Sequence, residues 1–350
     1  MNVLDTEKSA STSPSSGGSA EQRRRRGRAA RFLRRGGVAV VAVLALIGAV
    51  STWNWFTAAP DSGHFRSLEG RDEYVAAYEE SFAALPPPTA THDLRTSHGI
   101  VRVYEWSSPA TEAEEPIVLM PGRSSGAPMW SQNLPALVAE HPVFAFDALG
   151  DAGMSVQQVR FDGYEDQATY LADLVEQVAP EGAHLVGHSF GGRLAVSLAS
   201  ARPELVTSLS LLEPAMAFAN PPVNILLWSG VAFLPGIPES WRSRALTEIG
   251  GEPYDPEDPM ARMIEAGAEH YQAGLPQPGV LSEEEIAGLE MPVYVALGER
   301  GSLAGGDRAA EAAGGLPDGT VQVWPGTTHS LPMQAGAELD RVVLAHIAAS

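Results

Sequence analysis

Short apolar runs alternate with longer stretches of helical character along most of the chain. The apolar runs, rich in β-branched residues, predict strands at residues 100–106, 117–120, 143–146, 183–187, 206–212, 293–297 and 321–324. The stretches between and around them predict helices at residues 72–85, 129–140, 164–179, 190–200, 307–313 and 333–348. Alternation of this kind is typical of an α/β fold, with a mostly parallel central sheet flanked by helices.

Residues 214–290 interrupt this alternation. They are rich in proline and contain helical pieces such as residues 259–273. We expect this segment to be a helical lid that is inserted between two strands and covers the strand ends. Apolar side chains such as Trp228 and Phe233 favour an apolar group in a ligand, although the same side chains would also serve to pack the lid.

The N-terminal region has the pattern of a membrane-targeting segment. Eight arginines between residues 23 and 35 precede thirteen apolar residues at 38–50, and two tryptophans follow at 53 and 55. This pattern predicts a disordered basic tail (1–37) and an uncleaved anchor (38–56), with a cleaved signal or a buried core helix as alternatives. A linker with an amphipathic helix (57–90) and a globular domain (91–350) would follow. We expect a single-pass protein of the cell membrane with its domain outside the cytoplasm, or a secreted protein if the segment is cleaved.

Composition excludes several classes of function. The net charge is −20 although residues 1–35 are basic, so the rest of the chain is strongly acidic and unsuited to nucleic acid. The chain has no cysteine, which excludes disulfides, thiolate metal sites and a cysteine nucleophile. Its histidines show no metal-ligand spacing. We therefore predict neither metal nor cofactor, and the sequence carries no indication of the oligomeric state.

A Gly-X-Ser-X-Gly motif stands at residues 187–191, between a predicted strand and a predicted helix. In that context the serine lies on a turn too sharp for a side chain at Gly187 or Gly191. The turn lifts the hydroxyl of Ser189 above the sheet and leaves the amide of Phe190 free to stabilise developing negative charge. A chance match is the alternative in a chain with 35 glycines, but the flanking strand and helix favour a nucleophile.

With these residues the sequence resembles the α/β-hydrolase family over about residues 94–350. Pro121-Gly122-Arg123 follows a predicted strand where the family has His-Gly-X, so the resemblance implies that the amide of Arg123 is a second oxyanion donor. Residues 147–155 resemble a structural turn of the family, Asp-X-X-Gly-X-Gly-X-Ser, with one extra residue. The resemblance implies the α/β-hydrolase fold, with the lid at 214–290 inserted after strand 6.

A serine hydroxyl is a poor nucleophile without a general base, which is most often histidine. Among nine histidines, His329 lies beyond the last predicted strand and before the last helix, where the family keeps its catalytic histidine. His188 is next to the nucleophile in sequence, but in a sharp turn its side chain would point away from that of Ser189. We predict His329 as the base.

The catalytic acid departs from the family pattern. The family usually has Gly-X-X-Asp after the second-last strand, and the aspartate position is Gly301 here. The resemblance then points to Glu213, directly after residues 206–212, because a subgroup of haloalkane dehalogenases places a glutamate there. Glu299, two residues early, and Asp307, at a helix start, are alternatives. A triad without an acid is a third.

These residues together predict a serine hydrolase. Ser189 would attack the carbonyl of a small carboxylic ester with an apolar group, and His329 would activate water to release the acyl-enzyme. A lactonase, a carbon–carbon bond hydrolase, a peptidase or an acyltransferase could use the same residues. A catalytically inert surface binding protein with this fold is the alternative from a different class.

Overall fold

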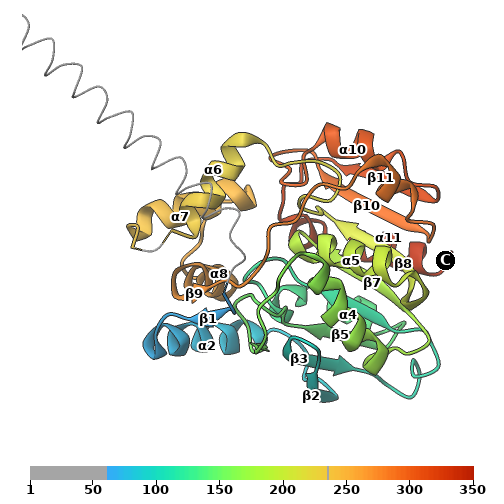
Figure 1. Ribbon diagram of the computed structural model, residues 1–350, viewed down its shortest axis with the longest axis horizontal. Coiled ribbons are helices and arrows are strands. Elements are labelled where there is room, and N and C mark those ends of the chain that lie inside the picture. Colours follow the sequence, from blue (N-terminus) through green and yellow to red (C-terminus); the bar gives the residue numbers. More distant parts are fainter. Residues whose placement is uncertain (1–60, 235) are drawn as a thin grey trace, which may run out of the picture. The chain divides into compact units, whose positions relative to one another are not determined.

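The computed structural model describes residues 61–234 and 236–350 (Figure 1). The predicted tail at 1–37 and the predicted anchor at 38–56 lie outside these residues. Among the helices that are described, none combines the length and apolar character needed to cross a membrane.

The described residues form a central sheet of nine strands. In chain order these are β2 (Ala90–Arg95), β3 (Gly99–Trp106), β4 (Ile117–Met120), β5 (Val143–Phe146), β6 (Val156–Gln157), β7 (Ala183–His188), β8 (Val206–Leu212), β10 (Val293–Gly298) and β11 (Gly319–Trp324). The spatial order is β11-β10-β8-β7-β4-β5-β3-β2, with β6 beside β3. Pairing is parallel from β11 to β5, whereas β3 runs antiparallel to β5, β2 and β6. The predicted mostly parallel sheet is confirmed.

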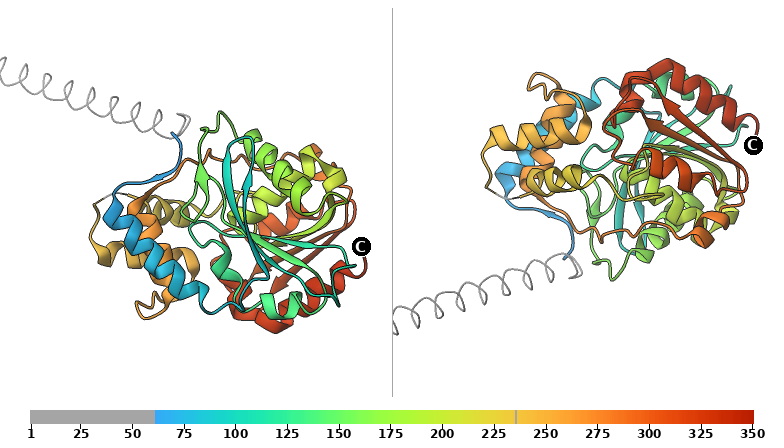
Figure 2. Two further views of the ribbon diagram at one scale, coloured as in Figure 1. Left: turned by 90° about the horizontal axis from the view of Figure 1, so that it is seen from below. Right: turned by 90° about the horizontal axis from the view of Figure 1, so that it is seen from above.

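Helices cover both faces of this sheet and the region beyond one of its ends. They are α2 (Leu68–Phe82), α3 (Leu134–Leu137), α4 (Glu165–Val178), α5 (Phe190–Ala201), α6 (Val223–Ala232), α7 (Glu239–Gly250), α8 (Pro259–His270), α9 (Glu283–Ala287), α10 (Asp307–Ala313) and α11 (Leu331–Ile347), with 3-10 turns η1 (Ala127–Trp130) and η2 (Pro203–Leu205). Figure 2 shows the sheet between α4 and α5 on one face and α3 and α11 on the other. The predicted flanking helices are confirmed.

Burial explains why the central strands were predictable. Every residue of β4, β5 and β7 is buried, because helices pack on both faces. The sequences of β4 and β5 are accordingly continuous apolar runs. The edge strand β2 was not predicted. Its sequence, Ala-Thr-His-Asp-Leu-Arg, is mostly polar, and its residues alternate between exposed and half-buried, as suits a strand with one neighbour.

The predicted helix at residues 129–140 is wrong. The chain forms η1 and then the four-residue helix α3 instead. Pro135 has no N–H to donate, and inside a continuous helix its ring would clash with the carbonyl of Ser131. Pro135 therefore stands in the first turn of α3, where a proline is tolerated.

The segment inserted between β8 and β10 contains α6, α7, α8 and α9. Helices α6, α7 and α8 lie together beyond one end of the sheet (Figure 1). Strand β9 (Tyr271–Gln272), which follows α8, pairs antiparallel with β1 (His64–Phe65) near the start of the described chain.

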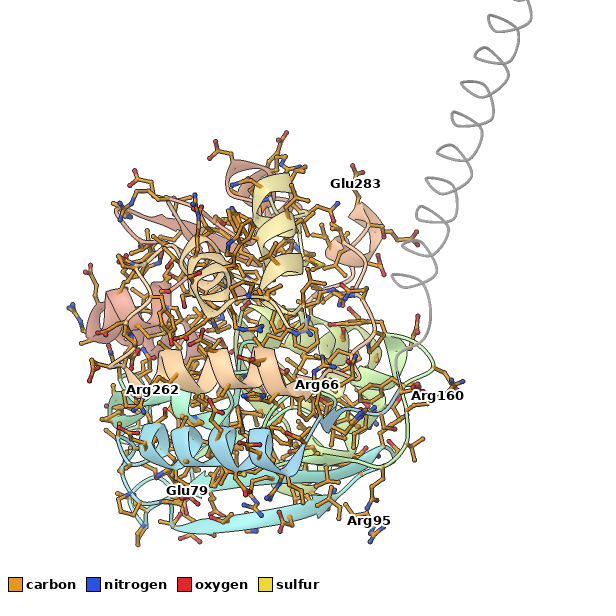
Figure 3. The ribbon with its side chains drawn as sticks, turned by 90° about the vertical axis from the view of Figure 1, so that its left-hand side faces the viewer. Arg66, Glu79, Arg95, Arg160, Arg262 and Glu283 are labelled. Carbon is orange, nitrogen blue, oxygen red and sulfur yellow. The ribbon has the colours of Figure 1, made fainter. Side chains whose placement is uncertain are left out.

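Helix α2, from the predicted linker region at 57–90, packs against α8. Figure 3 shows the two helices side by side. They run antiparallel, because Arg262 near the start of α8 pairs with Glu80 near the end of α2 at 2.6 Å, whereas the Arg66 amide just before α2 bonds the carbonyl of His270. Residues 64–82 are therefore packed as part of the same compact unit.

Candidate active site

Ser189 is the single residue between β7 and α5. It has φ 54° and ψ −119°, a strained backbone conformation for a residue with a side chain. A Cβ added at Gly191 would lie 2.1 Å from the carbonyl oxygen of Met120, and one at Gly187 would lie 2.6 Å from that of Gly191. Glycine is thus required on both sides of the serine, as the motif predicts.

His329 lies between β11 and α11, next to Ser189. Its Nε2 is 2.9 Å from the hydroxyl oxygen of Ser189. Its Nδ1 is 3.1 Å from a carboxylate oxygen of Glu213. All three side chains are buried. The structure therefore brings the predicted nucleophile, base and acid into one hydrogen-bonded chain, in the geometry that serine hydrolases require.

Glu213 directly follows β8, with φ 49° and a fully buried side chain. One carboxylate oxygen accepts hydrogen bonds from the Gly298 amide at 2.6 Å and the Ser302 hydroxyl at 2.7 Å. The other oxygen accepts from the amides of Leu303 at 3.0 Å and Ala304 at 3.3 Å, besides facing His329. Residues 298–304, which run from the last residue of β10 into the loop after it, therefore form a cradle of donors around the carboxylate.

This cradle controls the ionisation of Glu213. Burial by itself raises the pKa of the carboxyl group, since charge is disfavoured away from water. The hydrogen bond to His329 and the positive charge of that ring lower the pKa, and so do the hydrogen bonds from Gly298 and Ser302. The net effect is a pKa below the ordinary value for glutamate. Glu213 is accordingly a carboxylate at neutral pH, able to fix the tautomer of His329.

The two alternative acids lie elsewhere. Glu299 is exposed, and its carboxylate accepts from the amide of Gly326 at 2.8 Å. Asp307 is exposed at the start of α10. Neither has a contact with His329, whose Nδ1 faces Glu213. The loop that usually carries the acid in the family thus holds Glu213 in place with amides and one hydroxyl.

The side chain of His188 lies in an unexpected place. We expected its side chain to point away from that of Ser189, but it lines the same cavity as Ser189 and His329. Its Nε2 donates to the backbone carbonyl of His329 at 2.9 Å, and the two rings lie 4.9 Å apart. Burial and then the charge of His329 lower the pKa of His188 to about 3. The neutral imidazole of His188 therefore holds the backbone of His329 in place.

Two backbone amides near Ser189 have no acceptor among the described residues. One belongs to Phe190 at the start of α5, and the other to Arg123 in the loop after β4. Both residues line the cavity that Ser189 lines. Free amides beside a serine nucleophile are suited to accept an oxyanion.

The predicted structural turn at 147–155 holds the loop that carries Arg123. Asp151 accepts from the amide of Ser124, the next residue, at 2.6 Å. Asp147 accepts from the amides of Ala127 and Met154, both at 2.8 Å. Burial raises the pKa of Asp147, and these amides oppose the rise. Both aspartates therefore fix the direction of the loop amides without touching the cavity.

A cavity of about 340 Å³ opens at Ser189, a size suited to a small ligand. The inserted segment forms much of its wall and contributes mainly apolar side chains, which are Ala215, Met216, Phe233, Leu246, Ile249, Met260, Ala261, Ile264 and Leu275. No group of three or more His, Cys, Asp or Glu residues in the described part of the chain could hold a metal ion.

The sheet order, the turn at Ser189 and the order Ser189, Glu213, His329 along the chain define an α/β hydrolase. Residues 117–342 match the sequence model of the Alpha/beta hydrolase family, and the chain belongs to that family.

Named relatives extend the comparison. Carboxylesterase YbfK of Bacillus subtilis is 25% identical over 295 residues, which cover 82% of this chain and 97% of that protein. Its crystal structure, titled carboxylesterase CesB (YbfK), has a TM-score of 0.74 at 22% identity and covers 81% of this chain and 100% of that one. The structure of naproxen esterase from Bacillus subtilis has a TM-score of 0.73 at 22% identity, and the match covers 81% of this chain and 99% of that one. Likeness at this identity shows the shared fold.

We expect the imidazole of His188 to stay neutral from about pH 7 to about pH 5, because its pKa of about 3 lies below this range. In the unfolded chain a histidine titrates near pH 6.5, so the unfolded state binds this proton first. The contribution of His188 to the free energy of unfolding should thus fall as the pH drops below about 6.5. NMR spectra of ¹⁵N-labelled histidine rings, assigned with His188→Gln, measure the titration. A His188 midpoint above about pH 5 would contradict the prediction.

Proposed function

We propose that this protein is a serine hydrolase that cleaves carboxylic esters through an acyl-enzyme on Ser189. The observation that carries the proposal is the continuous contact from Ser189 through His329 to a fully buried Glu213. Relatives named as carboxylesterases, and the mainly apolar cavity at Ser189, favour esters among the substrates of acyl transfer.

Acylation follows from the positions of the three side chains. His329 Nε2 takes the proton of the Ser189 hydroxyl as the oxygen attacks the ester carbonyl carbon. The carbonyl oxygen becomes an oxyanion, which the amides of Phe190 and Arg123 receive. The intermediate then collapses, the bond to the alcohol oxygen breaks, and His329 returns its proton to the departing alcohol. The carboxylate of Glu213 stabilises the transient imidazolium.

Deacylation repeats these steps with water in place of the alcohol. His329 Nε2 takes a proton from a water molecule, whose oxygen attacks the acyl carbon. The same two amides receive the second oxyanion. The bond to the Ser189 oxygen breaks, His329 returns the proton to that oxygen, and the carboxylic acid leaves.

Replacement of the nucleophile tests the proposal most directly. We expect Ser189→Ala to lose labelling by a fluorophosphonate probe and to lower kcat for p-nitrophenyl butyrate by on the order of 10⁴–10⁶-fold, because the acyl-enzyme can no longer form. Ser210→Ala is a matched control, since it removes a buried hydroxyl with no hydrogen bond from β8. Wild-type protein that neither reacts with the probe nor hydrolyses esters would favour the inert binding protein.

The identity of the acid is tested by comparing three isosteric variants. Glu213→Gln should lower kcat by on the order of 10³–10⁴-fold, because an amide does not stabilise the imidazolium and can hold the wrong tautomer. Glu299→Gln and Asp307→Asn should stay within about threefold of wild type, since exposed groups away from the base contribute little. If Glu213→Gln stays active and either of the other two variants loses activity, Glu213 is not the catalytic acid.

We further propose that residues 38–56 anchor the enzyme in the cell membrane, with the hydrolase domain outside the cytoplasm. The supporting observations are the arginine-rich stretch before thirteen apolar residues and the tryptophans after them. The relatives do not address this segment.

Fractionation of the producing cells tests the anchor. The full chain should stay in the membrane pellet after an alkaline carbonate wash, and a protease added outside the cytoplasm should digest it. A chain lacking residues 1–60 should fractionate with soluble proteins. Full-length protein in the soluble cytoplasmic fraction, or a released form shortened near residue 58, would contradict an uncleaved anchor.

A further inference from the structure

The side chain of Arg123 lies at the cavity of Ser189 without an ionic partner. Its guanidinium carbon is 4.3 Å from the ring centroid of Phe233, which the inserted segment contributes to the same cavity. Burial lowers the pKa of this guanidinium. Stacking on one aromatic face gives some stabilisation but uses none of the five N–H donors of an arginine.

Within residues 61–234 and 236–350, no group accepts a hydrogen bond from the Arg123 side chain, and no carboxylate lies within salt-bridge distance. Its Nε is fully buried and unpaired. The acidic group that affects its charge most is Asp151, whose oxygens already accept from the amide and hydroxyl of Ser124. Arg123 as a residue is half-buried, but its buried Nε–H group without an acceptor is unfavourable unless something else supplies one.

Two other buried arginines do find acceptors. Arg193 also stacks on an aromatic ring, that of Tyr164 at 4.6 Å, yet it donates to the hydroxyl of Ser197 at 2.7 Å. Arg242 donates to the carbonyl of Ala232 at 2.6 Å. Arg242 leaves two buried nitrogens unpaired, but it has at least one acceptor, whereas Arg123 has none among the described residues and is the arginine of that part of the chain that lines the cavity.

We propose that the guanidinium of Arg123 binds a carboxylate of the substrate, so that the enzyme prefers esters that carry a free carboxylate beside the scissile ester. The inference rests on the proposed ester hydrolysis at Ser189. A guanidinium binds a carboxylate through two parallel hydrogen bonds, which would satisfy donors that the protein leaves unused.

The cavity favours a monoanion on a short spacer. Arg123 is the sole Lys or Arg among the cavity residues that the structure describes, so one negative charge is matched and two are not. Its own backbone amide is a proposed oxyanion donor, so the carboxylate would lie within one arginine side chain of the ester carbonyl. A half-ester of a short dicarboxylic acid fits both conditions.

Three carboxylates also line the cavity and would repel an anion. Glu252, Asp255 and Asp258 are exposed, so water and salt screen their charges. The guanidinium of Arg123 is more buried, and its interaction with a bound ion is screened less. Physiological ionic strength therefore weakens the repulsion between these carboxylates and an anion more than the attraction between Arg123 and that anion.

The test compares two esters of nearly equal size, mono-p-nitrophenyl glutarate and methyl p-nitrophenyl glutarate, in which only the first is charged. Wild type should show the higher kcat/KM for the charged ester. Arg123→Met should lower the ratio of the two kcat/KM values by about 10- to 100-fold, the effect of losing hydrogen bonds between charged groups. Arg123→Lys keeps the charge without the planar guanidinium, so its ratio should lie between those of wild type and Arg123→Met.

Arg160→Met is the matched control, because it removes an exposed arginine that pairs with Asp162 outside the cavity. Its ratio should equal that of wild type. An unchanged ratio in Arg123→Met overturns the proposal, and so does an equal loss for both esters, which would mean that only the oxyanion amide has moved.

Direct binding separates this proposal from the proposed reaction. Monomethyl glutarate should bind Ser189→Ala in isothermal titration calorimetry, with at least about tenfold weaker binding to Ser189→Ala/Arg123→Met. Such a difference supports the carboxylate site even if wild type hydrolyses neither ester, in which case only the proposed hydrolysis fails. Equal or undetectable binding to both variants overturns the carboxylate site.

Discussion

A carboxylate with no exposed surface can stay ionised only if protein groups replace its lost water, and at Glu213 two parts of the chain do so. The end of β10 and the loop after it supply amides and the Ser302 hydroxyl, and the loop before α11 supplies His329. These donors balance the cost of burial, since the net pKa is lowered. The need to satisfy this one group explains why the two loops approach each other, and their approach places His329 beside Ser189.

A second constraint acts on the opposite side of the serine. The close approach of Gly191 to the carbonyl of Met120 joins the end of β4 to the start of α5. This contact brings the loop that carries Arg123 next to the amide of Phe190. Asp151 and Asp147 then fix that loop, because they accept hydrogen bonds from the amides of Ser124 and Ala127. The amides of Phe190 and Arg123, which have no acceptor among the described residues, are thereby placed at the same cavity.

The parts of the molecule divide between chemistry and ligand selection. The proposed nucleophile, base and acid and the free amides all come from residues that follow the carboxyl ends of four parallel strands, β4, β7, β8 and β11. The inserted segment contributes the apolar wall and the ring of Phe233 over Arg123. Because α2 packs along α8, residues before the sheet also support this wall (Figure 3). The residues that form the cavity wall are thus separate in the chain from the residues that follow the sheet strands and are proposed to carry the reaction.

Local sequence determined those features whose physical cause is local. Continuous apolar runs mark β4 and β5 because both faces of these strands are buried, and the glycines around Ser189 are required by the turn itself. No continuous helix forms at 129–140 because Pro135 is not tolerated in a helix interior, and the edge strand β2 has too few apolar positions for its sequence to predict a strand.

Tertiary structure alone decided which donors meet which acceptors. Ser189 lies 140 residues from His329, and Glu213 lies 116 residues from it. The sequence narrowed the acid to candidates, but the cradle at 298–304, the inward ring of His188 and the unpaired guanidinium of Arg123 depend on how distant loops pack. Spacing along a chain predicts local conformation, whereas hydrogen-bond partners across a fold are set by burial, which only the packed structure defines.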